Sequence, residues 1–129
     1  MKTIPKIKWL DSPEEHDYPA AYSYLRLTYT YSFVYRLIDD LRQSNIILFK
    51  AKDIFRASGL SLLGVSNSHV VKNTEKIKDG VLLSPLLLVG DARTGKVIIA
   101  DGYHRLCSIY ILNEDAEIPC KIAYIKVET

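Results

Sequence analysis

Cysteine is scarce in this sequence of 129 residues, and the two that occur are Cys107 and Cys120. Two cysteines cannot build the disulfide framework of a small secreted domain, and their spacing lacks the close pairs of a zinc-binding knuckle. Free thiols fit the reducing interior of a cell. We therefore expect a cytoplasmic protein without disulfides or structural zinc.

Charge of one sign and long apolar runs are also lacking. The 17 Lys and Arg residues nearly balance the 15 Asp and Glu residues, and the formal net charge is +2 with His neutral. Such a small excess gives no broad positive field, so DNA binding is not expected. The longest apolar run, 81–89, is interrupted by Ser84 and Pro85 and is far shorter than the ~20 residues of a membrane span. The N-terminus lacks the apolar region of a signal peptide, and we expect no membrane partner.

The composition that is present is typical of a folded globular protein. Apolar residues make up 48% of the sequence and charged residues 25%. The length is sufficient for one core, and no repeat, low-complexity tract or linker interrupts it. We predict a single domain over residues 1–129, with a mainly helical portion at 1–45 and an α+β core at 46–129.

The first portion has the apolar spacing of helices. A capping box formed by Ser12 and Glu15, with Pro13 between them, predicts a helix start or a turn. A fresh helical segment is expected over 17–27, and a further helix from Ser32, where apolar residues recur at helical spacing. Aromatic residues alternate over 29–35, which would equally suit a strand. We predict that this stretch is mostly helical.

The remainder alternates between strand and helix patterns. An apolar run at 46–49 predicts a buried strand, and 83–89, 97–100 and 118–127 predict further strands, the middle two joined by a hairpin turn at 91–96. Helices are predicted at 52–58, 69–78 and 103–112, the first two ended by glycine. This order indicates an α+β fold with some parallel strand pairing.

A short motif between the third strand and the last helix carries most of the functional information. It reads Asp101-Gly102-Tyr103-His104-Arg105. Helix N-termini present free N–H groups to anions, glycine allows close approach of the backbone, and an arginine in the first turn can clamp a phosphate. The alternative is structural: Asp101 caps the helix, Gly102 relieves backbone strain, and His104 and Arg105 are solvated.

The elements around this motif resemble the ParB/sulfiredoxin superfamily over about 69–125. The matching features are a helix ending in glycine, a strand containing Ser84-Pro85, a hairpin into Ile99-Ala100-Asp101-Gly102-Tyr103-His104-Arg105-Leu106, and a closing Ile118-Pro119-Cys120 strand. The resemblance implies a ParB/sulfiredoxin-like mixed sheet and a phosphate loop formed by Asp101, Gly102, Tyr103, His104 and Arg105. The implied ligands are ATP, ADP or CTP, with or without Mg²⁺.

The sequence is also similar to small bacterial proteins of undefined activity that share the Lys-Ala-Lys-Asp-Ile and Ala-Asp-Gly-Tyr-His-Arg blocks. It departs from sulfiredoxin, whose nucleophilic cysteine is replaced here by Tyr103, so sulfiredoxin repair chemistry is not expected. It also lacks the helix-turn-helix region that follows the nucleotide domain of ParB. The resemblance therefore implies nucleotide binding, and possible phosphotransfer, without naming a substrate.

Further residues are candidates for the pocket around the motif. Asn67 and His69 precede or begin a helix that can face the same anion, and Lys72 follows one turn later. Ser84 and Lys52 are additional candidates, the latter because a lysine at a strand end can reach a phosphate. A phosphotransferase also requires an acid or base, and Glu14, Glu15 and Asp53 are equally eligible. For each residue the alternative is a helix cap or a solvated charge.

Two functions follow from these observations. The first is a nucleotide-binding or phosphate-binding protein, with small-molecule phosphotransfer as its possible reaction. The second is a non-enzymatic interaction or regulatory module that keeps the fold, suggested by the unassigned acid or base and by the tyrosine-rich first third. We expect those tyrosines to pack on the sheet with their hydroxyls in water.

Overall fold

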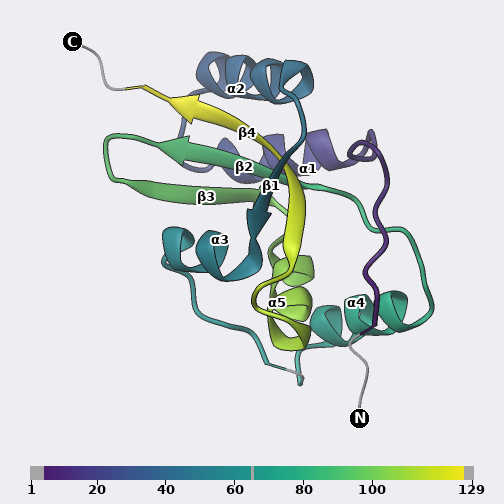
Figure 1. The fold of residues 1–129 in the computed structure, drawn as a ribbon. Coiled ribbons are helices and arrows are strands. Elements are labelled where there is room, and N and C mark those ends of the chain that lie inside the picture. The colour runs from purple at the N-terminus through teal and green to yellow at the C-terminus, as the bar shows by residue number, and fades with distance from the viewer. Residues whose placement is uncertain (1–4, 65, 127–129) are drawn as a thin grey trace.

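The computed structural model describes residues 5–64 and 66–126 of the chain. Figure 1 shows helices packed on both sides of a mixed β-sheet, which confirms the predicted α+β class. Within the described residues the elements are α1 (Asp17–Leu25), α2 (Tyr31–Gln43), β1 (Ile47–Lys50), α3 (Ala51–Ser58), α4 (Ser68–Lys78), β2 (Leu86–Asp91), β3 (Lys96–Asp101), α5 (Tyr103–Leu112) and β4 (Glu117–Ile125).

The sheet has the strand order β1-β4-β2-β3. The β2–β3 hairpin is antiparallel, whereas β2 and β4 run parallel, with Leu86 opposite Cys120. A parallel neighbour requires a crossover, which α5 supplies between β3 and β4. The predicted mixture of antiparallel and parallel pairing is confirmed.

The two faces of the sheet carry separate apolar clusters because successive strand residues point to opposite faces. Leu87 and Val89 of β2 pack with α1 and α2, while Leu86 and Leu88 pack with α3 and α5. In Figure 1, α1 and α2 lie on one side of the sheet and α3 and α5 on the other, with α4 beside α5. A hydrogen bond of 2.9 Å from Ser108 Oγ of α5 to the Val70 carbonyl joins these last two helices.

The first portion is helical, as predicted, and of the two alternatives at Ser12, a helix start or a turn, the structure has the turn. Residues 12–16 form a bend and a turn, and α1 begins at Asp17 with His16 as its N-cap residue. Pro19 is tolerated because it lies in the first turn, where its missing N–H costs no helical bond. The aromatic stretch enters α2 rather than a strand, since burying Val34 and Leu41 requires helical spacing.

The tyrosines of this portion fit the packing prediction only in part. Tyr18 is buried and Tyr22 is half-buried, whereas Tyr24, Tyr31 and Tyr35 are exposed. The three rings of Tyr22, Tyr31 and Tyr35 contact one another, with centroids 4.5 to 6.0 Å apart. Much of this aromatic surface therefore packs on itself beside the helices rather than on the sheet.

The apolar run at 46–49 forms a strand, but the prediction that it is buried is wrong. β1 occupies an edge of the sheet, and Ile47 and Leu48 are 44% and 55% exposed. Four apolar residues in sequence do not distinguish a central strand from an edge strand. Among the described residues, no helix combines the length and apolar character needed to cross a bilayer.

Alanine substitution on both faces of the sheet tests whether the helical first portion belongs to the same cooperative unit. Leu41 of α2 and Leu106 of α5 are fully buried on opposite faces. We expect Leu41→Ala and Leu106→Ala each to lower the free energy of unfolding by about 2–5 kcal/mol. Each should shift one common transition in urea, followed by circular dichroism and by Trp9 fluorescence. Leu48→Ala on the exposed edge should change it by less than about 0.5 kcal/mol; separate transitions for the two probes would contradict a single unit.

Candidate functional site

A single residue, Gly102, connects β3 to α5, and its backbone has a conformation that residues with a side chain rarely adopt. Gly102 has φ +111° and ψ 15°, a left-handed conformation that strains residues with a side chain. A Cβ at this position would also lie 2.7 Å from Cγ of the buried Leu86. Glycine therefore permits both the turn and the close approach of β2.

The first turn of α5 presents main-chain N–H groups without a capping side chain. The first intrahelical hydrogen bond runs from the Leu106 N–H to the Gly102 carbonyl at 2.9 Å. Within residues 5–64 and 66–126, the N–H groups of Tyr103, His104 and Arg105 have no acceptor. Such orphan donors, together with the helix dipole, favour an anion. The alternative in which Asp101 caps this helix is wrong, because its carboxylate accepts from Arg105 instead.

These amides border a small pocket of about 140 Å³ between α4 and α5. Two imidazoles line it, His69 from α4 and His104 from α5, with ring centroids 4.6 Å apart. The remaining lining residues are Asn73, Asp101, Gly102, Tyr103 and Arg105. The start of α4 therefore lies near the start of α5, and His69 reaches the predicted phosphate loop.

His104 is a neutral hydrogen-bonding group in this pocket. Burial lowers the pKa of His104, and the neighbouring His69 lowers this pKa further. At neutral pH one ring nitrogen of a neutral imidazole donates and the other accepts. Burial and the second imidazole thus both favour the neutral ring of His104.

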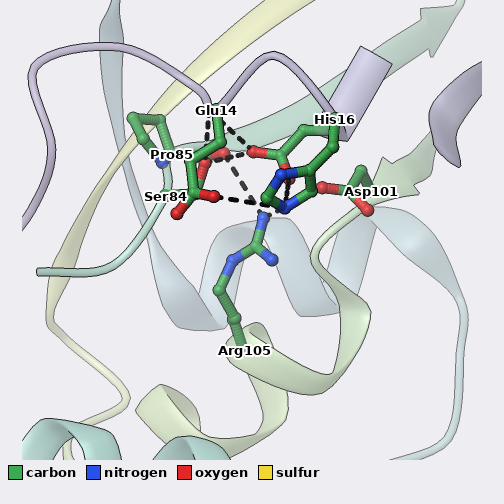
Figure 2. Close-up of polar contacts among 7 residues, drawn as sticks. Glu14, His16, Ser84, Pro85, Asp101 and Arg105 are labelled. Atoms are coloured by element: carbon green, nitrogen blue, oxygen red, sulfur yellow. Dashed lines mark hydrogen bonds and ion pairs between the residues drawn. The ribbon is translucent and has the colours of Figure 1, made fainter. Parts of the chain in front are cut away.

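Arg105 points inward, toward the start of β2, rather than into free solution. Its side chain is 16% exposed, and Nη2 lies 3.2 Å from Asp101 Oδ2 and 3.4 Å from the Pro85 carbonyl oxygen (Figure 2). Nε is buried and has no partner among the described residues. The guanidinium therefore holds Asp101 and Pro85 together, and it borders the pocket without standing free inside it.

A second carboxylate, Asp17, lies beside this pair and was missed by the sequence analysis. Its Oδ2 accepts from the Glu14 N–H at 3.0 Å and from the Ser84 hydroxyl, and His16 Nε2 lies 3.4 Å from Oδ1. Figure 2 shows Glu14, His16 and Ser84 gathered above the Arg105 guanidinium. Asp17 looked like an ordinary acidic residue of a first helical turn. The available signal was its place on the buried stripe with Ala21 and Leu25.

Asp101 has the unusual electrostatic environment of the site. Burial raises the pKa of Asp101, Arg105 opposes this increase, and the nearby Asp17 carboxylate adds to it. A carboxyl group with a raised pKa is a better proton acceptor than an exposed one. Asp101 is the carboxylate that lines the pocket, whereas Glu14, Glu15 and Asp53 line no part of it.

A β-bulge aims Asp101 at this site. Leu88 pairs with Ile99, and the preceding Leu87 pairs with Asp101, so β3 has one extra residue, Ala100. A bulge bends the strand and redirects the side chain that follows. The end of β3 consequently turns toward Arg105 instead of continuing the regular ladder.

The other predicted pocket residues do not line the pocket, although Ser84 lies beside Arg105 of the motif. Asn67 caps α4, accepting from the N–H groups of His69 and Val70, so its oxygen is already engaged. Lys72 is exposed outside the pocket lining, and Ser84 binds Asp17. Lys52 forms an ion pair with Asp115 at 2.7 Å and lies outside the pocket as well.

The cysteines have none of the features of reactive thiols. Both are buried, and burial raises the pKa of Cys107 and raises that of Cys120 to about 12. A thiol with a raised pKa carries little thiolate at neutral pH and reacts slowly. Within the described part of the chain, no group of three or more His, Cys, Asp or Glu side chains is arranged to hold a metal ion.

Comparison with known proteins adds no assignment: no protein-family model, curated protein or solved structure matches the chain. The ParB/sulfiredoxin resemblance therefore stays a prediction, and the site is interpreted from its own geometry.

Replacing two glycines separates the cost of backbone strain from the cost of the close approach at the site. Gly95 in the hairpin turn has φ +71°, and no atom lies within 4 Å of the place that an added methyl group would take, whereas at Gly102 that group would contact Leu86. We expect Gly95→Ala to cost about 1–2 kcal/mol of unfolding free energy and Gly102→Ala distinctly more, measured in urea. Equal losses would show that β2 does not constrain the turn.

The pH dependence of stability tests the electrostatics of Asp101 against Asp91, a buried carboxylate that is likewise paired with an arginine, Arg93. The pKa of Asp101 is raised above its ordinary 3.8 in the folded chain, so its contribution to stability falls as the pH rises above 3.8. The Arg93 hydrogen bond lowers the pKa of Asp91, so its contribution is lost as the pH falls through 3.8.

The matched substitutions should therefore have opposite pH profiles. The free energy of unfolding is measured in urea across the acidic pH range. The excess of the wild-type value over that of Asp101→Asn should shrink as the pH rises above 3.8. The excess over Asp91→Asn should instead grow as the pH rises toward 3.8. Parallel profiles for the two variants would rule out a raised pKa at Asp101.

Proposed function

We propose that the protein binds the phosphate group of a nucleotide or of another phosphorylated small molecule at the N-terminus of α5. The supporting observation is the set of three uncapped main-chain N–H groups, at Tyr103, His104 and Arg105, that border a pocket with two imidazoles. Main-chain donors at a helix start are a recurrent way of binding phosphate.

The pocket dimensions favour one phosphate group over a whole nucleotide. Its volume of about 140 Å³ is below the ~300–1,000 Å³ of cavities that enclose drug-sized ligands. A nucleoside attached to the bound phosphate would therefore lie outside this pocket. His69 is exposed at its margin and offers a flat ring to such a group.

Charge compensation supports an anionic ligand despite the acidic residue in the lining. Arg105 lies 3.2 Å from the Asp101 carboxylate and offsets its negative charge. The remaining donors are the main-chain amides and the N–H groups of the imidazoles. A phosphate would thus be held by directed hydrogen bonds rather than by a free lysine or arginine.

Phosphotransfer to a small-molecule hydroxyl is the reaction that these groups can assist. In such a step the hydroxyl oxygen attacks the terminal phosphorus, the bond to the nucleoside diphosphate breaks, and a base takes the hydroxyl proton. Asp101 is our candidate for that base because it lines the pocket and its pKa is raised. A Mg²⁺ ion supplied with the nucleotide would balance the phosphate charge.

A binding module without catalysis is the second candidate function. It is favoured by the ion pair between Asp101 and Arg105, which keeps the proposed base engaged. The two functions differ in turnover: a phosphotransferase converts ATP to ADP in the presence of its acceptor, whereas a module binds the nucleotide unchanged.

Calorimetric titration with inorganic phosphate, ATP, ADP and CTP, each with and without Mg²⁺, tests the binding proposal. Asn73→Asp adds a negative charge at the pocket wall with little change of shape. We expect this variant to weaken binding by about tenfold or more, which is about 1.4 kcal/mol.

Asn45→Asp is the matched control, because it makes the same charge change in an exposed loop before β1. Its affinity should equal that of the wild type. No heat with any of the four ligands, or an equal loss in both variants, would refute the α5 site.

A further inference from the structure

Within residues 5–64 and 66–126, β3 has no neighbouring strand on one side of its backbone. It is the last strand in the order β1-β4-β2-β3, and the described strand that pairs with it is β2. In Figure 1 it forms the border of the sheet beyond β2. Alternate residues of such an edge direct their N–H and C=O groups outward, where another extended chain can bind them.

An apolar groove of about 370 Å³ runs along this edge. Its walls come from opposite sides of the sheet: one from the end of α1 and the following turn, the other from the segment after α3. The apolar lining includes Tyr24, Leu27, Tyr29, Leu60, Val97 and Ile98. Leu27 is 78% exposed, so apolar surface is available at the groove.

The charge at the groove specifies the ligand further. Lys96 lies at the start of β3 and lines the groove, and its side chain has no acidic partner within the described residues. Asp91, in the same groove, is already paired with Arg93. On its paired side, β3 lies next to the apolar strand β2, in which Asp91 is opposite Lys96.

We infer that this groove binds an extended peptide segment that pairs with β3 as an added strand, carrying alternating apolar side chains and an acidic residue near Lys96. Main-chain hydrogen bonds would supply affinity, and the apolar walls and the lysine would supply specificity. Because walls flank β3 on both faces, a single strand fits the groove better than the edge of a second complete sheet. This site is distinct from the phosphate pocket at the opposite end of β3.

The test uses fluorescein-labelled peptides of six residues, the length of β3. Each alternates valine and threonine, and one aspartate occupies each position in turn across the set. We expect at least one peptide to bind in fluorescence anisotropy, to lose binding when alternate residues are N-methylated, and to slow hydrogen exchange of β3 amides. No binding by any peptide, or equal binding of the N-methylated form, would overturn the inference.

Protein variants assign the binding to the groove. Leu27→Asp should weaken the best peptide by about tenfold or more, and Lys96→Glu should reverse its preference from aspartate to lysine. Leu48→Asp, at the exposed edge of β1, is the matched control and should bind like the wild type. Equal losses of peptide affinity in Leu27→Asp and Leu48→Asp would overturn the inference. A wild-type dimer that Leu27→Asp converts to a monomer would also overturn it, because a second copy of the chain would then fill the groove.

Discussion

Burial of the Arg105 guanidinium is the constraint on which the site depends. An arginine stays charged in a protein, so its side chain, 16% exposed, must be matched by a carboxylate and a carbonyl. Asp101 and Pro85 supply these groups and thereby fix the end of β3 against the start of β2. Next to Pro85, Ser84 binds Asp17, which fixes the beginning of α1 at the same place. Three segments distant in sequence thus meet around one charge.

The same arrangement determines the character of the proposed phosphate site. Since Asp101 is engaged by Arg105, it does not cap α5, and the amides of the first turn are left free. The guanidinium in turn offsets the carboxylate that would repel an anion. A net charge of +2 gives no indication of such a site, because its donors are main-chain groups and imidazoles rather than clustered lysines.

The sequence predicts what depends on local patterns and fails where distant segments decide. The bounds of α5, the glycine turn and the helical character of the first portion follow from spacing and turn chemistry. The exposure of β1 does not, because an apolar run is the same at the edge and at the centre of a sheet. The role of Asp17 depends on Ser84, which is 67 positions away, and Lys52 is drawn to Asp115 instead of the motif.

The position of β3 explains how one short strand can contribute to both proposed surfaces. As an edge strand it keeps half of its backbone groups outward near Lys96, whereas at its other end the bulge at Ala100 turns Asp101 away from the ladder. A central strand could not direct backbone groups outward, because both of its sides would be paired along their length. Strand β2, which is buried along its whole length and runs parallel to β4, supplies the rigidity that this exposed strand lacks.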